Sequence, residues 1–289
     1  MSGFKVKNGI FQNNPFGIMQ GRLLPKYKGQ YQSHPVGSWQ KEFPIASKFS
    51  LDCIEFIVDF HSVREHPFFY NDGLSEIKNL ENLNNVKVLS ICADCFMQSP
   101  IFLENEILQD QNKNIFKKII NAASSLKINQ VVFPCVDNSS LQSEFNRDSF
   151  KEKFKDYVDI AYKEGIKISL ETDLAPRDFI KLLEAFDTDT IFVNYDIGNS
   201  VAMGYKFSEE LSAYGDRILD IHIKDRKLNG GSVFLGTGQA QFIEFFRSLK
   251  EYDFSGVFIM QAYRDENGIK SFTSQLEILR KAVSLAQYN

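Results

Sequence analysis

The chain contains the sequences KISLETD at residues 167–173, IFVNYDIGN at residues 191–199 and DIHIKD at residues 220–225. Each is a short run of apolar, β-forming residues that ends in polar side chains, the pattern of a buried strand of a parallel sheet. In parallel α/β proteins the carboxyl ends of the strands meet at one edge, and ligands bind there. We therefore expect an α/β protein whose chemistry lies at these strand ends.

The same alternation extends along the whole chain. Runs with strand character lie at residues 16–23, 53–58, 86–93, 130–136, 167–172, 191–197, 219–224 and 257–262. Apolar residues at helical spacing predict helices at residues 105–126, 150–164, 176–186, 242–252 and 272–286. A doubly wound sheet is the main competitor, but the Gly-rich phosphate turn typical of it does not follow the first run. We predict a single (β/α)8 TIM barrel over residues 1–289, with the loop 25–38 over its mouth.

Composition restricts the class of protein. Of 289 residues, 43% are hydrophobic and 24% charged, as in ordinary soluble enzymes, and the net charge of -4 gives no reason to expect nucleic-acid binding. No apolar run reaches the roughly 20 residues of a membrane helix, and Met1–Gln20 lacks the features of a secretory signal. The four cysteines fall in or beside predicted strands, as in a reducing compartment. We expect a cytoplasmic protein that binds a small molecule, with homo-oligomer formation left open.

Four consecutive predicted strands carry Glu171, Asp196, His222 and Gln261 at or near their ends. Equivalent heights on neighbouring strands would bring the four side chains to one point. Two carboxylates, an imidazole and an amide oxygen suit Mn²⁺, Mg²⁺, Co²⁺ or Zn²⁺. Alternatively, Asp196 only caps the next helix and His222 is a hydrogen-bonded core residue. An unpaired carboxylate in the apolar strand of Glu171 would be costly, so the coincidence of all four favours a metal site.

Other polar residues are weaker candidates. Lys224 shares the strand face of His222 and is predicted to act on the substrate, the alternative being an ion pair with a barrel carboxylate such as Glu55. The turn 236–238, Gly-Thr-Gly, offers backbone amides to an anion. Substrate binding is assigned to residues at or beyond strand ends: Gln20, Arg22, Asn199 and Arg264. For Arg22 the alternative is a surface ion pair.

Two further patterns have structural interpretations. Cys92 and Cys95 form a C-x-x-C pair, but no second pair exists for zinc, so both are predicted to be structural thiols. His61 and His66 follow the second predicted strand, where we expect loop residues near the mouth rather than ligands.

The motifs GIMQGRL at 17–23, YDIGN at 195–199, HIKD at 222–225 and LGTGQAQF at 235–242 occur in this order along the chain. In these motifs the chain resembles the sugar phosphate isomerase/epimerase family of xylose isomerase-like barrels. The resemblance implies that Glu171, Asp196 and His222 hold the metal. It places Gln261 where the family has a second glutamate. The related apurinic endonucleases use a histidine-rich cluster, which four histidines in the whole chain do not supply.

The resemblance also implies a chemistry. In that family two glutamates flank the sugar as acid/base groups, and proton transfer passes through a metal-bound enediolate. Glu171 is then the base, whereas the Gln261 amide can lend its oxygen to the metal but cannot carry a proton. This favours a one-base isomerisation over a two-base epimerisation. We predict a divalent-metal-dependent sugar or sugar-phosphate isomerase/epimerase. The alternatives are a degenerate barrel that binds carbohydrate without turnover and an inosose dehydratase-like lyase.

Overall fold

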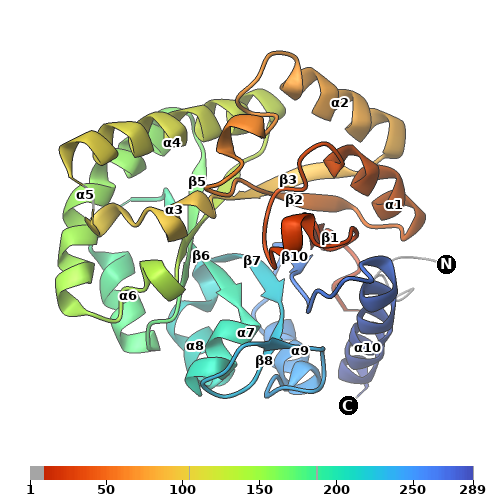
Figure 1. Ribbon diagram of the computed structural model, residues 1–289. Helices are drawn as coiled ribbons and strands as arrows, with labels where there is room; N and C mark the ends of the chain where they lie inside the picture. Colours follow the sequence, from red (N-terminus) through yellow and green to blue (C-terminus); the bar gives the residue numbers. More distant parts are fainter. Residues whose placement is uncertain (1–9, 104, 187, 289) are drawn as a thin grey trace.

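The computed structural model describes residues 10–103, 105–186 and 188–288 (Figure 1). Its parallel strands close into a barrel in the order β1-β10-β7-β6-β5-β4-β3-β2. The barrel strands are β1 (Phe16–Met19), β2 (Cys53–Ile57), β3 (Lys87–Cys92), β4 (Gln130–Cys135), β5 (Lys167–Thr172), β6 (Ile191–Asp196), β7 (Ile218–Ile223) and β10 (Val257–Met260). The predicted fold class is confirmed.

Helices lie around the barrel (Figure 1). They are α1 (Glu42–Lys48), α2 (Gly73–Asn84), α3 (Cys95–Gln98), α4 (Glu106–Leu126), α5 (Glu144–Lys163), α6 (Pro176–Glu184), α7 (Ile197–Met203), α8 (Phe207–Tyr214), α9 (Phe242–Lys250) and α10 (Ile269–Gln287). Short 3-10 turns lie at residues 27–29, 39–41, 63–65, 101–103, 137–139 and 215–217. A two-stranded antiparallel sheet, β8 (Asp225–Arg226) and β9 (Ser232–Val233), follows β7. In the part of the chain described, no helix has the length and apolarity needed to cross a membrane.

Some predicted boundaries differ from the observed ones, either because a turn ends a strand early or because the first turns of a helix are polar. The first strand ends at Met19 rather than at residue 23, because Arg22 N donates to Met19 O and Gly21 takes a positive φ of 84°. Helix α5 begins at Glu144, before its first buried apolar residue, Phe150. Helices α1, α2, α3, α7 and α8 were not predicted, because each is short or buries few apolar residues at regular spacing.

Aromatic side chains fill the layer between the barrel and helices α4 and α5. Phe133 on β4 stacks against Phe96 at 4.8 Å between ring centroids and meets Phe154 of α5 at 4.9 Å. Tyr157 of α5 also packs on Phe116 of α4 at 5.0 Å. Such buried rings contribute large apolar areas and defined ring–ring geometry, which fixes β4 relative to helices α3, α4 and α5.

The inside of the barrel contains both apolar and polar side chains. A small apolar cluster of inward side chains comprises Met19, Cys53, Ile57, Cys92, Val132 and Ile259. Alternate residues on the same inward faces are polar and fully buried, including Glu55, Ser90, Asp220 and His222. Buried polar groups need partners, so this layer predicts a specific hydrogen-bonded or metal-binding centre.

The loop 25–38 lies over the mouth of the barrel, as predicted. Gln32 of this loop hydrogen-bonds both Asp94 beyond β3 and Gln261 beyond β10. Arg264 donates to Pro25 O at 2.8 Å and to Tyr31 O at 3.1 Å, which ties the start and the middle of the loop to the segment after β10. The loop therefore lies over the segments that follow β3 and β10, the latter carrying Gln261.

Candidate metal centre and active site

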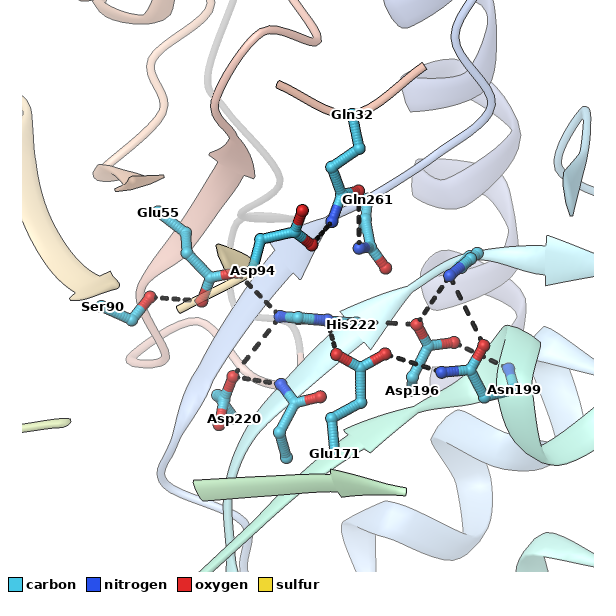
Figure 2. Close-up of polar contacts among 12 residues, drawn as sticks. Gln32, Glu55, Ser90, Asp94, Glu171, Asp196, Asn199, Asp220, His222 and Gln261 are labelled. Carbon is cyan, nitrogen blue, oxygen red and sulfur yellow. Dashed lines mark hydrogen bonds and ion pairs between the residues drawn. The ribbon is translucent and has the colours of Figure 1, made fainter. Parts of the chain in front are cut away.

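Glu171, Asp196 and His222 converge at the ends of β5, β6 and β7 (Figure 2). One potential ligand atom from each lies within 4.8 Å of the others. His222 Nδ1 is 3.9 Å from Glu171 Oε2 and 4.0 Å from Asp196 Oδ2. All three side chains are buried. The structure thus brings together the three residues that the sequence selected as metal ligands.

Asp196 caps a helix with one oxygen and turns the other toward the site. Its Oδ1 accepts a hydrogen bond from Asn199 N at 2.8 Å and caps helix α7. Its Oδ2 faces His222, whose backbone pairs with that of Asp196 in the β6–β7 register, and lies 3.2 Å from Lys224 Nζ. Burial raises the pKa of Asp196, but the positive charges of Lys224 and His222 outweigh this and hold that pKa below its ordinary value. The carboxylate is therefore ionised and one of its oxygens is turned to the site.

The imidazole of His222 is oriented from beneath by a second carboxylate. Nε2 lies 2.9 Å from Glu55 Oε1, and Ser90 Oγ donates to the other oxygen of Glu55 at 2.6 Å (Figure 2). Asp220 Oδ2 is 3.6 Å from the same ring nitrogen. Nδ1 has no hydrogen-bond partner among the described residues. An Nε2 turned to a carboxylate leaves Nδ1 as the ligand atom that faces Glu171 and Asp196.

The carboxylates around His222 determine its charge. Burial lowers its pKa, but the carboxylates of Glu55, Glu171 and Asp220 outweigh burial and raise the pKa of His222 to about 10. Without a cation the ring therefore carries a proton between carboxylates. A divalent ion bound at Nδ1 would replace that proton, as metal binding to histidine generally does. Glu55, Asp220 and His222 form a second possible ligand group, deeper in the barrel.

Glu171 is held by an amide. Asn199 Nδ2 donates to its Oε1 at 2.6 Å, which leaves Oε2 directed toward His222 (Figure 2). Burial, with the nearby Asp196 carboxylate, raises the pKa of Glu171 to about 8. A carboxyl group whose proton affinity lies near neutrality can accept and return a proton, which is the requirement for an acid/base group.

Gln261 offers a buried carbonyl oxygen. Its Nε2 donates to Gln32 Oε1 at 3.2 Å, and Figure 2 shows its amide directed toward the group formed by Asp196, Glu171 and His222. Its Oε1 has no hydrogen-bond partner within the described chain. Leaving a buried polar atom unpaired costs about 1–3 kcal/mol, so this oxygen and His222 Nδ1 are groups that a cation would satisfy. The donor set present fits a divalent metal ion.

Lys224 pairs with Asp196 rather than with Glu55. Its Nζ lies 3.2 Å from Asp196 Oδ2 and 3.5 Å from Asn199 Oδ1. Burial lowers the pKa of Lys224, but Asp196 and Glu171 raise it above its ordinary value. The side chain therefore remains an ammonium and can donate hydrogen bonds but not accept a proton.

Arg226 is a site residue that sequence reasoning missed. Its Nη1 donates to Asn199 Oδ1 at 2.8 Å, so it orients the amide that holds Glu171. The sequence indicated this position, because His222, Lys224 and Arg226 are alternate residues and alternate residues of an extended chain share a face. Gln32, Glu55, Ser90 and Asp94 were likewise not assigned to the site.

The other predicted substrate-binding residues contact the loop and its neighbours. Gln20 Oε1 lies 2.9 Å from His34 Nδ1. Arg22 donates to Tyr31 O at 3.1 Å and to Gln32 Oε1 at 3.0 Å, and Arg264 donates to Pro25 O and Tyr31 O. Arg22 is buried and is not a surface ion pair. Substrate binding by these residues and by Asn199 stays a prediction.

The predicted anion cradle at the Gly-Thr-Gly turn is filled by the protein itself. Gly236 N and Gly238 N donate to Asp225 Oδ2 at 2.9 and 2.8 Å, and Ala240 N donates to Oδ1 at 3.0 Å. A side chain at residue 238 would meet Asp225 Oδ1 at 2.1 Å, which explains the glycine. The expectation of a site for an external anion was therefore wrong: these amides bind an internal carboxylate that shapes the loop after β7.

The cysteines and histidines outside the centre have structural surroundings. Cys92 and Cys95 are buried and free, and burial raises the pKa of both thiols well above the ordinary value, in agreement with structural thiols. His61 is an exposed loop residue. His66 is also in a loop but is fully buried, with its ring 4.4 Å from that of His34.

The model of the family described as xylose isomerase-like TIM barrel matches residues 43–282. The chain belongs to this family. A relative named L-ribulose-5-phosphate 3-epimerase UlaE, from Salmonella heidelberg, is 23% identical over 246 residues, which cover 80% of this chain and 84% of the relative. The predicted resemblance to sugar phosphate isomerases and epimerases is confirmed, and the names of such relatives support the predicted isomerase class.

Solved structures of the same fold include two that contain metal ions. The IOLI protein with a bound zinc atom superposes with a TM-score of 0.71 at 17% identity, covering 95% of this chain and 99% of that one. A xylose isomerase-like TIM barrel protein from Mycobacterium smegmatis in complex with magnesium gives a TM-score of 0.69 at 17% identity, covering 99% and 100%. At these identities the likeness establishes the fold.

Proposed function

We propose that the protein is a divalent-metal-dependent isomerase or epimerase of ketoses or ketose phosphates. The observation that carries the proposal is the convergence of Glu171, Asp196 and His222 with the unpartnered oxygen of Gln261 at the mouth of the barrel. The name of the Salmonella relative suggests L-ribulose 5-phosphate as the first compound to test. Zinc and magnesium in structures of the same fold support the metal.

The charges of the ligand set suit a polarising metal site. Two carboxylates balance a divalent cation, while an imidazole and an amide add neutral ligand atoms. A metal ion held there would supply Lewis-acid polarisation of the substrate carbonyl. Lys224, which shares Asp196 with that ion, adds a further positive charge beside the centre.

Glu171 is the proposed base. Asn199 fixes one of its oxygens, Oε1, so the carboxylate cannot rotate freely. The Glu171 carboxylate removes the proton from the carbon beside the ketose carbonyl, and the electron pair of the broken C–H bond moves to the carbonyl oxygen to give an enediolate. Proton return to a carbon then gives the product. The buried setting excludes water, which strengthens the electrostatic stabilisation of the enediolate.

Lys224 is the proposed hydrogen-bond donor to the oxygen on which charge develops. Its ammonium group is within reach of Asp196 and Asn199, so it lies in the same cluster as the base. Arg226 adds a guanidinium group on the outer side of Asn199, where a substrate phosphate or hydroxyl group would meet it. Gln20, Arg22 and Arg264 remain proposed contacts for substrate hydroxyl or phosphate groups below the loop.

The metal is tested by isothermal titration of the apoprotein with Mn²⁺, Mg²⁺, Co²⁺ and Zn²⁺. We expect one site per chain, and we expect Asp196→Asn to weaken it by about 100-fold or more, since it removes a charged ligand. Asparagine retains an oxygen that can cap helix α7, so folding should persist. Asp173→Asn, at the end of β5 and hydrogen-bonded to Ser140, is the matched control and should bind normally. Equal binding by the wild type and Asp196→Asn would contradict the site.

Activity is tested on L-ribulose 5-phosphate, D-tagatose and D-psicose with the metal-loaded protein. Glu171→Gln should reduce turnover by about 100-fold or more, the usual contribution of a general base. Metal analysis of that variant separates loss of the base from loss of the ion. Metal binding without turnover of the three sugars would contradict the proposed activity and favour a barrel that only binds carbohydrate.

A further inference from the structure

A second buried carboxyl group lies beside Gln261. Asp94 lies two residues beyond the end of β3 and is the N-cap residue of the short helix α3. Its Oδ1 accepts a hydrogen bond from Gln32 Nε2 at 2.8 Å, and Oε1 of the same Gln32 accepts one from Gln261 Nε2 at 3.2 Å. A single carboxamide therefore separates Asp94 from Gln261. Asp94 Oδ2 has no hydrogen-bond partner within the described ranges.

Asp94 approaches the centre from another direction than Glu171. Figure 2 shows Asp94 and Gln32 on the side of His222 opposite to Glu171. The two carboxyl groups come from β3 and β5, with β4 between them in the barrel. Inversion of a carbon through a planar enediolate requires one proton carrier on each face of the plane. Gln261 cannot be such a carrier, because a carboxamide is neither an effective acid nor an effective base at neutral pH.

We propose that Asp94 is the second acid/base residue of the site, so that the reaction is a two-base epimerisation with Glu171 on one face of the sugar and Asp94 on the other. This inference rests on the proposed function. It changes the interpretation of Gln261, because the loss of a glutamate at the end of β10 is then compensated by a carboxyl group beyond β3.

The proton balance of the step is complete. Glu171 carboxylate takes the proton from the substrate carbon as that C–H bond breaks, and its electron pair forms the enediolate. The Asp94 carboxylic acid then forms the new C–H bond on the opposite face, its proton going to the carbon as the carbonyl is restored. Asp94 is left as a carboxylate and Glu171 as an acid. Exchange with water resets both, and the reverse reaction uses them in exchanged roles.

The surroundings of Asp94 allow it to hold a proton. Burial raises the pKa of Asp94 to about 6, the hydrogen bond from Gln32 opposes this, and the Asp59 carboxylate adds to it. Arg22 and Lys224 lower the pKa. The titratable groups that act on this carboxyl, or on which it acts, are Arg22, Asp59, Cys92, Cys95 and Lys224. A carboxyl group in this range supplies both protonation states near neutral pH.

Gln32 marks the place of a substrate hydroxyl. Its carboxamide donates to Asp94 and accepts from Gln261. A hydroxyl group also donates one hydrogen bond and accepts others, so a sugar hydroxyl between Asp94 and Gln261 would satisfy the same two partners. Gln32 belongs to the loop 25–38 and is only partly buried, which suits a side chain that the substrate displaces.

The test is Asp94→Asn, which keeps the size of the side chain and an oxygen for Gln32. The Mg²⁺-loaded protein is incubated with L-ribulose 5-phosphate, D-tagatose or D-psicose in deuterated water. NMR then measures both epimer formation and deuterium entry beside the carbonyl. We expect Asp94→Asn to reduce epimer formation by about 100-fold or more while deuterium still enters with retained configuration through Glu171. Asp94→Glu should recover part of the epimerisation, and Asp173→Asn should retain all of it.

The outcomes separate the two proposals. Epimerisation by Asp94→Asn at the wild-type rate would overturn the role of Asp94 and leave the proposed function intact. Formation of only the aldose by the wild type, without epimer, would establish one-base isomerisation and also overturn this role. Absence of both exchange and turnover in the metal-loaded wild type would overturn the proposed function, and this inference with it. Circular dichroism and the melting temperature of Asp94→Asn show whether a loss of activity reflects unfolding.

Discussion

The two sides of the barrel mouth are built differently. The side that we name the ligand side consists of Glu171, Asp196 and His222, at the ends of the neighbouring strands β5, β6 and β7. The side that we name the loop side consists of Gln32, Asp94 and Gln261, which come from the loop 25–38, from beyond β3 and from beyond β10. On the ligand side each functional group is fixed by a strand and by a second residue. On the loop side the groups are joined through one loop carboxamide.

In the proposed site the two sides have different requirements. A metal site needs ligands within narrow distances, which regular neighbouring strands supply. A proton carrier needs only reach and a suitable pKa, so a carboxyl group from another strand end can serve. On this proposal the ligand side keeps the three residues that the family resemblance selects as ligands, and Gln261 on the loop side departs from the resemblance.

The largest change in metal affinity is expected from substitution of Glu55, which lies beneath the ligand side. Glu55→Gln removes the carboxylate 2.9 Å from His222 Nε2. Loss of such a supporting group typically costs 10–100-fold in metal affinity, and we expect a loss in that range by isothermal titration. Ser90→Ala, which removes only the hydroxyl that donates to Glu55, should have a smaller effect. Unchanged affinity in Glu55→Gln would show that His222 is oriented without this carboxylate.

A smaller effect is expected at Gln261, where the two sides meet. Gln261→Glu adds a third carboxylate and should tighten metal binding by about tenfold through charge attraction. Gln261→Leu removes the unpartnered oxygen and should weaken it. In the Asp94→Asn background, Gln261→Glu should also restore epimerisation. Equal metal affinities of the glutamate, glutamine and leucine forms would exclude residue 261 from the coordination shell.

The ligand side could be predicted from the sequence because its residues lie in regular elements. Each strand of KISLETD, IFVNYDIGN and DIHIKD is marked by its own apolar run, so strand ends and inward faces follow from local pattern. The barrel itself followed from the same alternation. The helix-capping and the ligand interpretations of Asp196 could not be separated from the sequence. In the structure Oδ1 caps helix α7 and Oδ2 faces His222, so the two interpretations are compatible.

The loop side could not be predicted, because its contacts join residues far apart in the sequence. Nothing local indicates that Gln32 reaches Gln261, and Asp94 was considered only as part of the C-x-x-C motif. The prediction of an anion site at the Gly-Thr-Gly turn failed for a related reason. Its amides are typical of anion binding, but whether the anion is external depends on the direction of Asp225, which a local pattern does not specify.

A separate effect, on stability rather than on metal affinity, concerns the pH dependence at His34 in the loop 25–38. Burial lowers the pKa of His34 to about 4, although the Asp59 carboxylate opposes this, and His34 is fully buried. Because the unfolded chain binds a proton near pH 6.5 and the folded one does not, the free energy of unfolding falls as pH falls from about 6.5 to about 4. The linkage amounts to about 3 kcal/mol over that window.

The measurement is urea unfolding of the wild type and His34→Gln at several pH values. Burial raises the pKa of Glu42 to about 7, so protonation of Glu42 increases the free energy of unfolding as pH falls. Both proteins share this effect, so the difference between their free energies of unfolding reports on His34. Glutamine retains an amide that can reach Gln20 and has no proton to gain, so the variant should lose less stability than the wild type between pH 6.5 and 4. Parallel curves would mean that His34 is protonated in the folded protein. The folded protein would then accommodate a charged imidazole at the buried position of His34.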